Sequence, residues 1–256
     1  MKPNAVVLTV LTAAALLIQP RATDACTPQA PLADRVVGSV GRADVGFFVY
    51  PGISQSFFRF IVATIARGAR VPIGFEEMTQ PPDPFERTLA SVPDEERTIL
   101  LGLSVREALD ALVEADGRYA WREQDGVLLI RPVTAWRDGS HFLLQRAGPV
   151  DAKPQRAMSI VRSLYASQGL RIKSAGGGLI GEVGGSRELL DKQVTLMRTG
   201  GSLLDELNAI VKAHGELIWM VSYRFGPVTL GTSCIRMMTF DGLFGEIGPV
   251  ACASPR

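Results

Sequence analysis

Two segments of this chain repeat one another without a gap at a spacing of 98 residues. Residues 104–121 (SVREALDALVEADGRYAW) and residues 202–219 (SLLDELNAIVKAHGELIW) are identical at seven of eighteen positions. Similarity at a fixed internal period is the signature of a duplicated supersecondary unit. The chain is therefore expected to contain one fold unit twice, and the two copies should superpose.

A helix is predicted to begin directly after a serine in each copy. Ser104 and Ser202 are each followed three residues later by an acid, Glu107 or Asp205. This spacing is a capping box, in which the serine side chain accepts a hydrogen bond from a first-turn amide. Apolar residues then recur every three or four positions, as on the buried face of a helix. The predicted helices cover 105–116 and 203–214.

Each predicted helix leads into a strand. Gly117 and Gly215 are expected to supply the left-handed residue that ends the helix. The alternation that follows predicts a half-buried strand in which Trp121 or Trp219 points into the core. We prefer core packing to ligand stacking for both tryptophans, because a duplicated unit reuses its core first. The pair Asp125–Gly126 then predicts a tight hairpin.

A weaker similarity precedes each of these helices. The segments SFFRFIVATIARG and PQRAMSIVRSLYASQG carry helical apolar stripes that end at Gly68 and Gly169, and short strands, RVPIGF and LRIKS, follow them. An extra strand, FFVY, precedes the first helix. The predicted fold class is α+β, with two tandem modules that each pack two helices on a small mixed sheet. The expected divisions are an N-terminal linker (26–45), the first module (46–135), a linker (136–150) and the second module (151–256).

The phrase TILLGLSVREALDALVEADGRYAWREQDGVLLIRP, together with the upstream VPIGFE, resembles the short N-terminal domain of secretins and TonB-dependent transducers (STN domain). Residues 53–132 match this pattern throughout, whereas residues 154–240 match well only around VTLMRTGGSLLDELNAIVKAHG. The resemblance implies non-catalytic periplasmic modules that bind other proteins or organise an assembly. It does not identify the partner of this chain.

The N-terminus has the pattern of a secretory signal peptide, residues 1–25. Lys2 precedes an apolar run of about fifteen residues, which is shorter than the ~20 that a membrane-spanning helix needs. Thr23 and Ala25 suit a cleavage site, which would leave Cys26 as the first residue. Periplasmic or secreted protein is the expectation; the alternative is an outer-membrane lipoprotein acylated at Cys26. No later segment is long and apolar enough to cross a bilayer.

The charge balance argues against nucleic acid as a partner. The chain has 27 basic and 26 acidic residues, and no run of like charge marks a binding face. Hydrophobic residues make up 46% of the chain, which is enough for packed cores. We expect an envelope protein as the partner.

Several motifs suggest chemistry only weakly. The segment GGGLIG at 176–181 matches a dinucleotide pattern but does not open a helix, so a hairpin or bulge is preferred. His141 and His214 are each predicted to stand alone, and Glu76–Glu77 and Glu95–Glu96 are expected to be solvated surface charge beside a Pro-rich loop. Neither histidine has an acid at a recognisable triad spacing. We therefore expect no catalytic residue, no cofactor and no metal.

Three cysteines would meet an oxidising compartment after export. Cys234 and Cys252 are the preferred disulfide pair, because the glycines between them permit a return loop. The alternative pairs Cys26 with Cys252.

The final apolar strands, VTLG and CIRMMTF, carry few charges that would protect a sheet edge. A partner strand or helix is predicted to dock there on Met237 or Met238, whichever faces outward. The insertion at 79–97 is the alternative surface.

These features together predict an exported, non-catalytic protein-binding or scaffold protein of the bacterial envelope. The alternative is a small-molecule or glycan binder that uses a cleft between the modules, for which a polar pocket at that place would be the sign. An enzyme is the third class.

Overall fold

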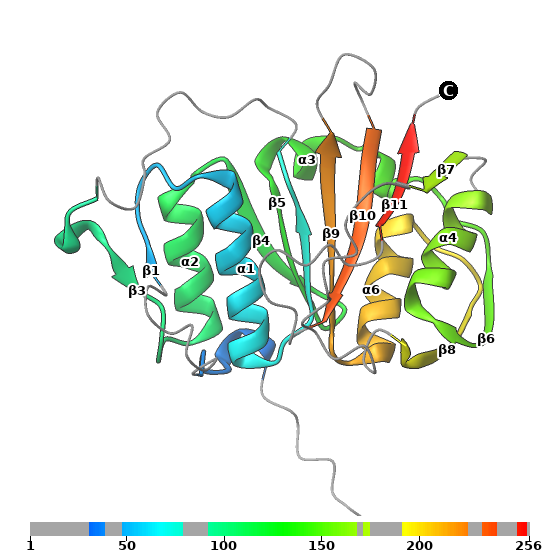
Figure 1. Cartoon of the computed structure of the whole chain (residues 1–256), viewed down its shortest axis with the longest axis horizontal. Helices are drawn as coiled ribbons and strands as arrows, with labels where there is room; N and C mark the ends of the chain where they lie inside the picture. The colour runs from blue at the N-terminus through cyan, green and yellow to red at the C-terminus, as the bar shows by residue number, and fades with distance from the viewer. Residues whose placement is uncertain are drawn as a thin grey trace, which may run out of the picture.

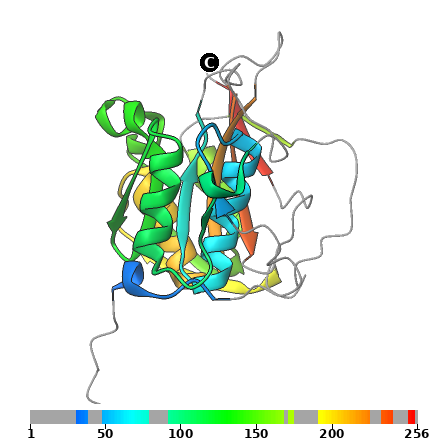
Figure 2. The same cartoon turned by 90° about the vertical axis from the view of Figure 1, so that its left-hand side faces the viewer.

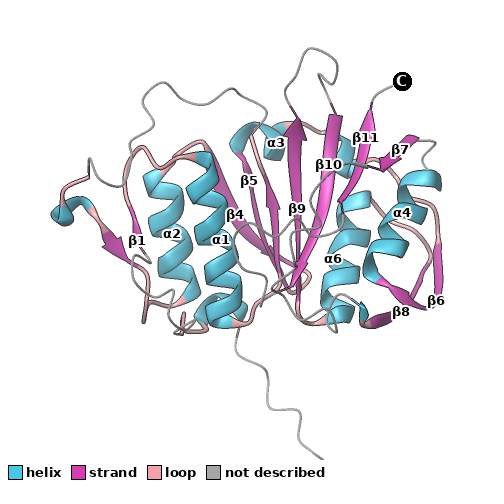
Figure 3. Cartoon of the chain, in the orientation of Figure 1, coloured by secondary structure: helices cyan, strands magenta, loops and turns pink. Residues whose placement is uncertain are grey.

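The computed structural model describes residues 31–38, 48–78, 92–167, 171–174, 191–224, 232–239 and 250–254. Within these ranges the chain combines helices with β-sheet, so the predicted α+β class is confirmed (Figure 3). None of the helices in the described ranges is both long enough and apolar enough to cross a membrane.

The two halves of the chain share one order of elements in the described ranges, except that the first half adds the turn η4 and the second half adds the strand β11. The first half contains the 3₁₀ turn η1 (Leu32–Asp34), β1 (Phe48–Val49), α1 (Gln55–Ala69), β2 (Ile73–Glu76), the turn η4 (Asp94–Glu96), β3 (Thr98–Ile99), α2 (Val105–Ala115), β4 (Tyr119–Gln124) and β5 (Val127–Pro132). A short helix, α3 (Val133–Arg137), then leads to the second half. That half contains η5 (Phe142–Leu144), β6 (Val150–Arg156), α4 (Ala157–Ser167), β7 (Arg171–Ser174), β8 (Gln193–Arg198), α6 (Leu203–His214), β9 (Leu217–Arg224), β10 (Thr232–Thr239) and β11 (Val250–Ser254).

One seven-stranded sheet runs through both halves (Figure 1). Its order is β4-β5-β2-β9-β10-β11-β7, and β2 pairs in parallel with β5 on one side and with β9 on the other. β11, which the sequence did not predict, lies between β10 and β7 and is antiparallel to both. The halves are thus joined by the β2–β9 pair, whereas the sequence predicted a separate small sheet for each module.

The helix pairs cover opposite faces of this sheet. In β5, Leu128 packs with α1 and α2, whereas its neighbour Leu129 packs with α4 and α6. In β9, Met220 belongs to the first core and Trp219 to the second. Neighbouring residues of a strand point to opposite faces. α1 and α2 lie side by side at one end of the molecule (Figures 1 and 2), and each half contributes a strand to the core of the other.

The 3₁₀ turns are part of the repeated unit. The main-chain N–H of Val105, at the start of α2, donates to Arg35 O just after η1, at 2.7 Å. The N–H of Leu203, at the start of α6, donates in the same way to Gln145 O just after η5, at 2.9 Å. Residues 142–148, which the sequence assigned to a linker, therefore belong to the second repeat. Each half also pairs two short strands apart from the main sheet, β1 with β3 and β6 with β8.

Most of the local predictions are confirmed. Both capping boxes are formed, with the hydroxyls of Ser104 and Ser202 accepting from the amides three residues on. Gly215 is left-handed at φ 81°, and the turn at 125–126 has positive φ at both residues, as a tight hairpin requires. The prediction that a left-handed Gly117 ends α2 was wrong, because the helix ends at Asp116 with φ −139°.

α1 runs past Gly68, where the sequence placed its end. It ends instead at Arg70, which is left-handed at φ 51°. Gly68 lies against the segment that follows η1: its carbonyl accepts from the N–H of Gly38 at 3.1 Å, and a Cβ at Gly68 would lie 2.7 Å from Gly38 O. The glycine serves this close approach rather than a helix end.

Because the two cores share strands, we expect the chain to unfold in one transition. Leu109→Ala and Leu207→Ala, each at a fully buried site of a different core, should each lower the free energy of unfolding by about 2–5 kcal/mol. Glu114→Ala on the exposed side of α2 is the control, with a change within about 0.5 kcal/mol. Two separate transitions, or a Leu109→Ala effect confined to the first repeat in hydrogen exchange, would contradict the shared core.

Candidate functional site

The two repeated tryptophans make the same hydrogen bond. The indole N–H of Trp121 donates to Asp110 Oδ1 on α2 at 2.8 Å, and that of Trp219 donates to Asn208 Oδ1 on α6 at 2.9 Å. Both bonds join residues eleven apart, at equivalent positions of the repeat. Each indole is therefore held over its own helix in the same way. Trp219 is completely buried, as predicted, whereas Trp121 is only half-buried.

The difference in burial comes from the neighbouring strand. Gly74 of β2 lies opposite Trp219 in the parallel β2–β9 pair. A Cβ at Gly74 would overlap the Cε2 and Cζ2 atoms of Trp219, so the indole lies across the strand at the one place without a side chain. Gly74 thus allows β2 to add to the edge of β9.

The equivalent edge of β4 has no strand beside it in the part of the chain that the structure describes. β4 corresponds to β9 in the repeat and pairs only with β5, which corresponds to β10. In β9 the edge away from β10 is taken by β2, where Val221 O accepts from the N–H of Glu77 at 2.8 Å. The open edge of β4 is therefore a candidate site for a strand.

A buried polar cluster lies at the ends of β2 and β5. Arg131 Nε donates to Glu76 Oε2 at 2.7 Å, and His141 Nε2 lies 2.7 Å from Glu76 Oε1. The Arg131 guanidinium also lies over the Trp136 ring, 5.0 Å from its centroid. Glu76 and Arg131 are each 1% exposed. The cluster ties the segment after β5 to the sheet.

The hydrogen bonds of His141 determine its tautomer. Its Nδ1 accepts from the main-chain N–H of Leu143 at 3.2 Å and faces Arg131 Nη2 at 3.1 Å. Both neighbours are donors, so the proton of the neutral ring lies on Nε2, which donates to Glu76. The three side chains bind one another, which indicates a structural role for the cluster.

Two predictions about charged residues were wrong here. Glu76 and Glu77 are buried rather than solvated, and Glu77 pairs with Arg59 at 2.8 Å. His141 does not stand alone, because it contacts Glu76. The sequence carried one signal for this cluster, namely an arginine, Arg131, within a strand that is otherwise apolar and buried at every position. Such a residue needs a buried partner.

A second buried acid lies at the start of α6. Glu206 is 0% exposed, and its Oε2 has no hydrogen-bond partner among the described residues. Burial raises the pKa of Glu206 above the ordinary glutamate value, while Arg198, 3.4 Å from Oε1, opposes the shift. His214, at the other end of α6, is also buried, and its Nδ1 accepts from the N–H of Glu216.

The methionines proposed as a docking surface are not at a sheet edge. β10 lies between β9 and β11, so its main chain is paired on both sides. Met237 is 1% exposed and packs in the core beneath α4 and α6. Met238 occupies the next position of β10. The prediction of an open edge here was wrong, because β11 covers it.

The register of β10 and β11 places Cys234 directly opposite Cys252. Facing positions on antiparallel strands are close enough for a disulfide. Their pairing stays a prediction that a count of free thiols would test. Cys26, the segment 176–181 and most of the insertion at 79–97 lie outside the described residues.

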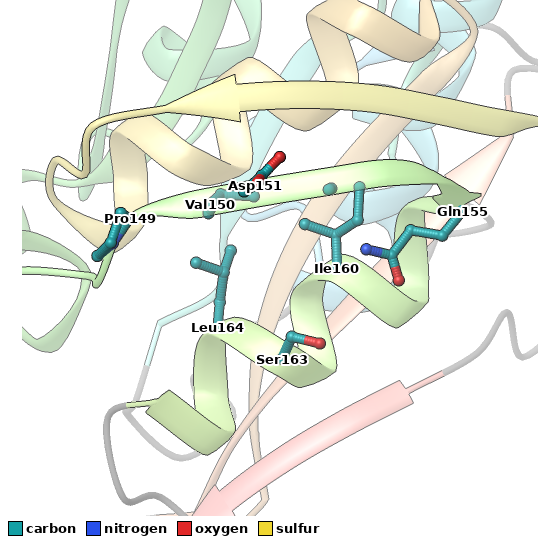
Figure 4. A pocket seen from close by; sticks show the side chains of 8 residues that line it. Pro149, Val150, Asp151, Gln155, Ile160, Ser163 and Leu164 are labelled. Carbon is teal, nitrogen blue, oxygen red and sulfur yellow. The ribbon is translucent and has the colours of Figure 1, made fainter.

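A small groove lies within the second repeat, between β6 and α4 (Figure 4). Its volume is about 200 Å³. The lining residues are Pro149, Val150, Asp151, Ala152, Gln155, Ile160, Ser163 and Leu164. The groove does not lie between the repeats, where a ligand cleft was expected as the alternative.

Searches with models of known protein families, curated proteins and solved structures found no match to this chain.

Gly74→Ala tests the contact that joins the repeats. The added methyl group would overlap the Trp219 indole, so we expect a loss of about 1–3 kcal/mol or more in the free energy of unfolding, measured by denaturant titration. Gly139→Ala is the matched control, because no atom lies within 4 Å of a Cβ built there. Equal stability of the two variants would show that β2 and β9 are not in contact as described.

Glu76→Gln tests the buried cluster. The substitution keeps the shape of the side chain but leaves the Arg131 charge buried without a counter-charge, which should cost about 3–5 kcal/mol. Glu123→Gln, at an exposed position of the neighbouring hairpin, should change stability by less than about 0.5 kcal/mol. If the Glu76 variant were as stable as this control, the cluster would not be buried.

Glu206→Gln tests the second buried acid. Since the pKa of Glu206 is raised in the folded state, the folded protein binds more protons than the unfolded chain just above the ordinary glutamate pKa, and stability falls as pH rises through that window. The stability of the unmodified chain should therefore fall relative to Glu206→Gln as the pH rises above the ordinary glutamate pKa. Thermal unfolding of both proteins at each pH measures this, and parallel pH profiles would contradict the shift.

Proposed function

We propose that this chain is an exported protein-binding or scaffold protein of the bacterial envelope. The signal-peptide pattern at 1–25 supports export. The resemblance of residues 53–132 to STN domains supports a module that binds other proteins.

The observation that carries the binding part of the proposal is the β2–β9 pair. The chain itself adds a strand to the edge of one repeat, with Gly74 beneath Trp219, and the described structure leaves the equivalent edge of β4 unpaired. Strand addition to an open edge is a common mode of protein recognition. The repeat thus offers a surface for a partner on a rigid, well-packed sheet.

Expression in a Gram-negative host tests the proposal. The full chain should be recovered from the envelope fraction with a mature N-terminus at Cys26, and chemical crosslinking there should join it to one or a few envelope proteins. A version that lacks residues 2–25 is the matched control, since it keeps the described fold but stays in the cytoplasm. An uncleaved cytoplasmic product, or the same crosslinks from both versions, would contradict the proposal.

A further inference from the structure

We propose that the open edge of β4 binds an extended strand of a partner protein, parallel to β4, with a glycine opposite Trp121. The inference rests on the proposed function, of which it names the surface and the chemistry of the partner. It follows from the internal repeat, because the chain shows the same edge occupied once, at β9, and open once, at β4.

The main-chain groups of β4 are oriented for such a strand. Arg118 O accepts from the N–H of Val133, so alternate residues from 118 onward point their main-chain groups toward β5. Trp121 and Glu123 therefore point theirs outward. They correspond to Trp219 and Val221, whose main-chain groups face β2. The described chain makes no hydrogen bond to the outward groups of these two β4 residues.

The Trp121 side chain selects the residue that can lie opposite it. Its bond to Asp110 matches that of Trp219 to Asn208, so the two indoles lean the same way from their strands. At β9 the indole covers the neighbouring strand and leaves room only for glycine. At β4 the Trp121 indole has no strand beside it among the described residues, and it is only partly buried. A bound strand would cover it, and any residue larger than glycine at that position would meet the ring.

The strand at the other end of the sheet does not meet this requirement. β7 is the repeat equivalent of β2, and among the described strands it pairs only with β11. A second copy could therefore present β7 to β4, but the four residues Arg171–Ser174 include no glycine. A strand from a different protein is thus the expected occupant.

The charged residues of β4 do not close the edge. Arg122 and Glu123 are exposed, and such charges discourage edge-to-edge aggregation of identical sheets. The Arg122 guanidinium lies over the Trp136 ring, 4.5 Å from its centroid, on the face away from α2. In this position the Arg122 side chain does not cover the outward main-chain groups of Trp121 and Glu123, so a partner strand can pair with them.

A peptide copied from the β2 segment of this chain can be used to test the site. A peptide with the sequence RVPIGFEEM, residues 70–78, copies the strand that pairs with β9. Added to the full chain, it should slow hydrogen exchange at the outward amides of Trp121 and Glu123, whereas the Arg122 amide, already bonded to β5, should change little. The matched control peptide replaces the glycine by valine, Gly74→Val, and should bind at least about tenfold more weakly, because its side chain meets the indole.

Two variants of the chain distinguish the contribution of the Glu123 main-chain N–H to peptide binding from that of its side chain. Glu123→Pro removes an outward N–H at an edge position that tolerates proline, and it should weaken peptide binding about threefold to tenfold. Glu123→Ala keeps that N–H and removes only the carboxylate, so it is the reference against which the effect of the proline is measured. If Glu123→Pro does not fold, the two peptides on the unmodified chain still decide the matter.

Equal binding of the two peptides, or protection away from Trp121 and Glu123, would overturn the inference. Concentration-dependent self-association of the chain that Glu123→Pro abolishes would also overturn it, since the occupant would then be a second copy. An envelope partner captured equally by the unmodified chain and by Glu123→Pro would leave the proposed function standing and refute the β4 site alone.

Discussion

The parallel pair of β2 and β9 is the contact on which the rest of the structure depends. It turns two short sheets into one and gives each helix pair a wider surface to cover. The pair is possible because Gly74 has no side chain where the Trp219 indole crosses β2. A small unit buries a limited share of its apolar surface alone, and sharing strands enlarges both cores. The duplication therefore gives one continuous sheet rather than two separate modules joined by a linker.

The buried cluster of Glu76, Arg131 and His141 acts on this same junction. Glu76 is the last residue of β2, and Arg131 lies near the end of β5, so their ion pair fixes how far the two parallel strands extend together. His141 also contacts Glu76, so it attaches the segment that leads into the second repeat to the end of β2. A buried ion pair is seldom a large source of stability, because desolvation offsets the attraction. Its value here is specificity, since a shifted strand would leave a charge buried without a partner.

Local features of the fold could be predicted from the sequence, and long-range ones could not. The capped helices and the hairpin at 125–126 depend on neighbouring residues, so their signals are written within a few positions. The order of strands depends on which edges meet, and alternation along a strand does not specify its neighbour. β11 illustrates this, because its insertion beside β10 buried the edge on which Met237 was expected to bind a partner. Arg131 was the one residue whose type alone pointed to the buried cluster.

The sequence differences between the two copies correlate with how deeply each tryptophan-bearing strand is buried. Trp219 donates to a neutral amide, Asn208, in a buried setting, whereas Trp121 donates to a carboxylate, Asp110, that solvent can reach. Burial of a charge is costly, so an amide suits the covered copy.

The faces of β9 and β4 that point away from their own helices also differ in burial. Ile218 and Met220 are covered by the helices of the first repeat, while the equivalent residues of β4 are Ala120 and Arg122. Helix α3 covers part of that face instead, since the Trp136 indole N–H donates to Ala120 O at 3.1 Å. An arginine there would be poorly placed beneath a further pair of helices. The edge of β4 is therefore suited to a single added strand, and not to another complete repeat.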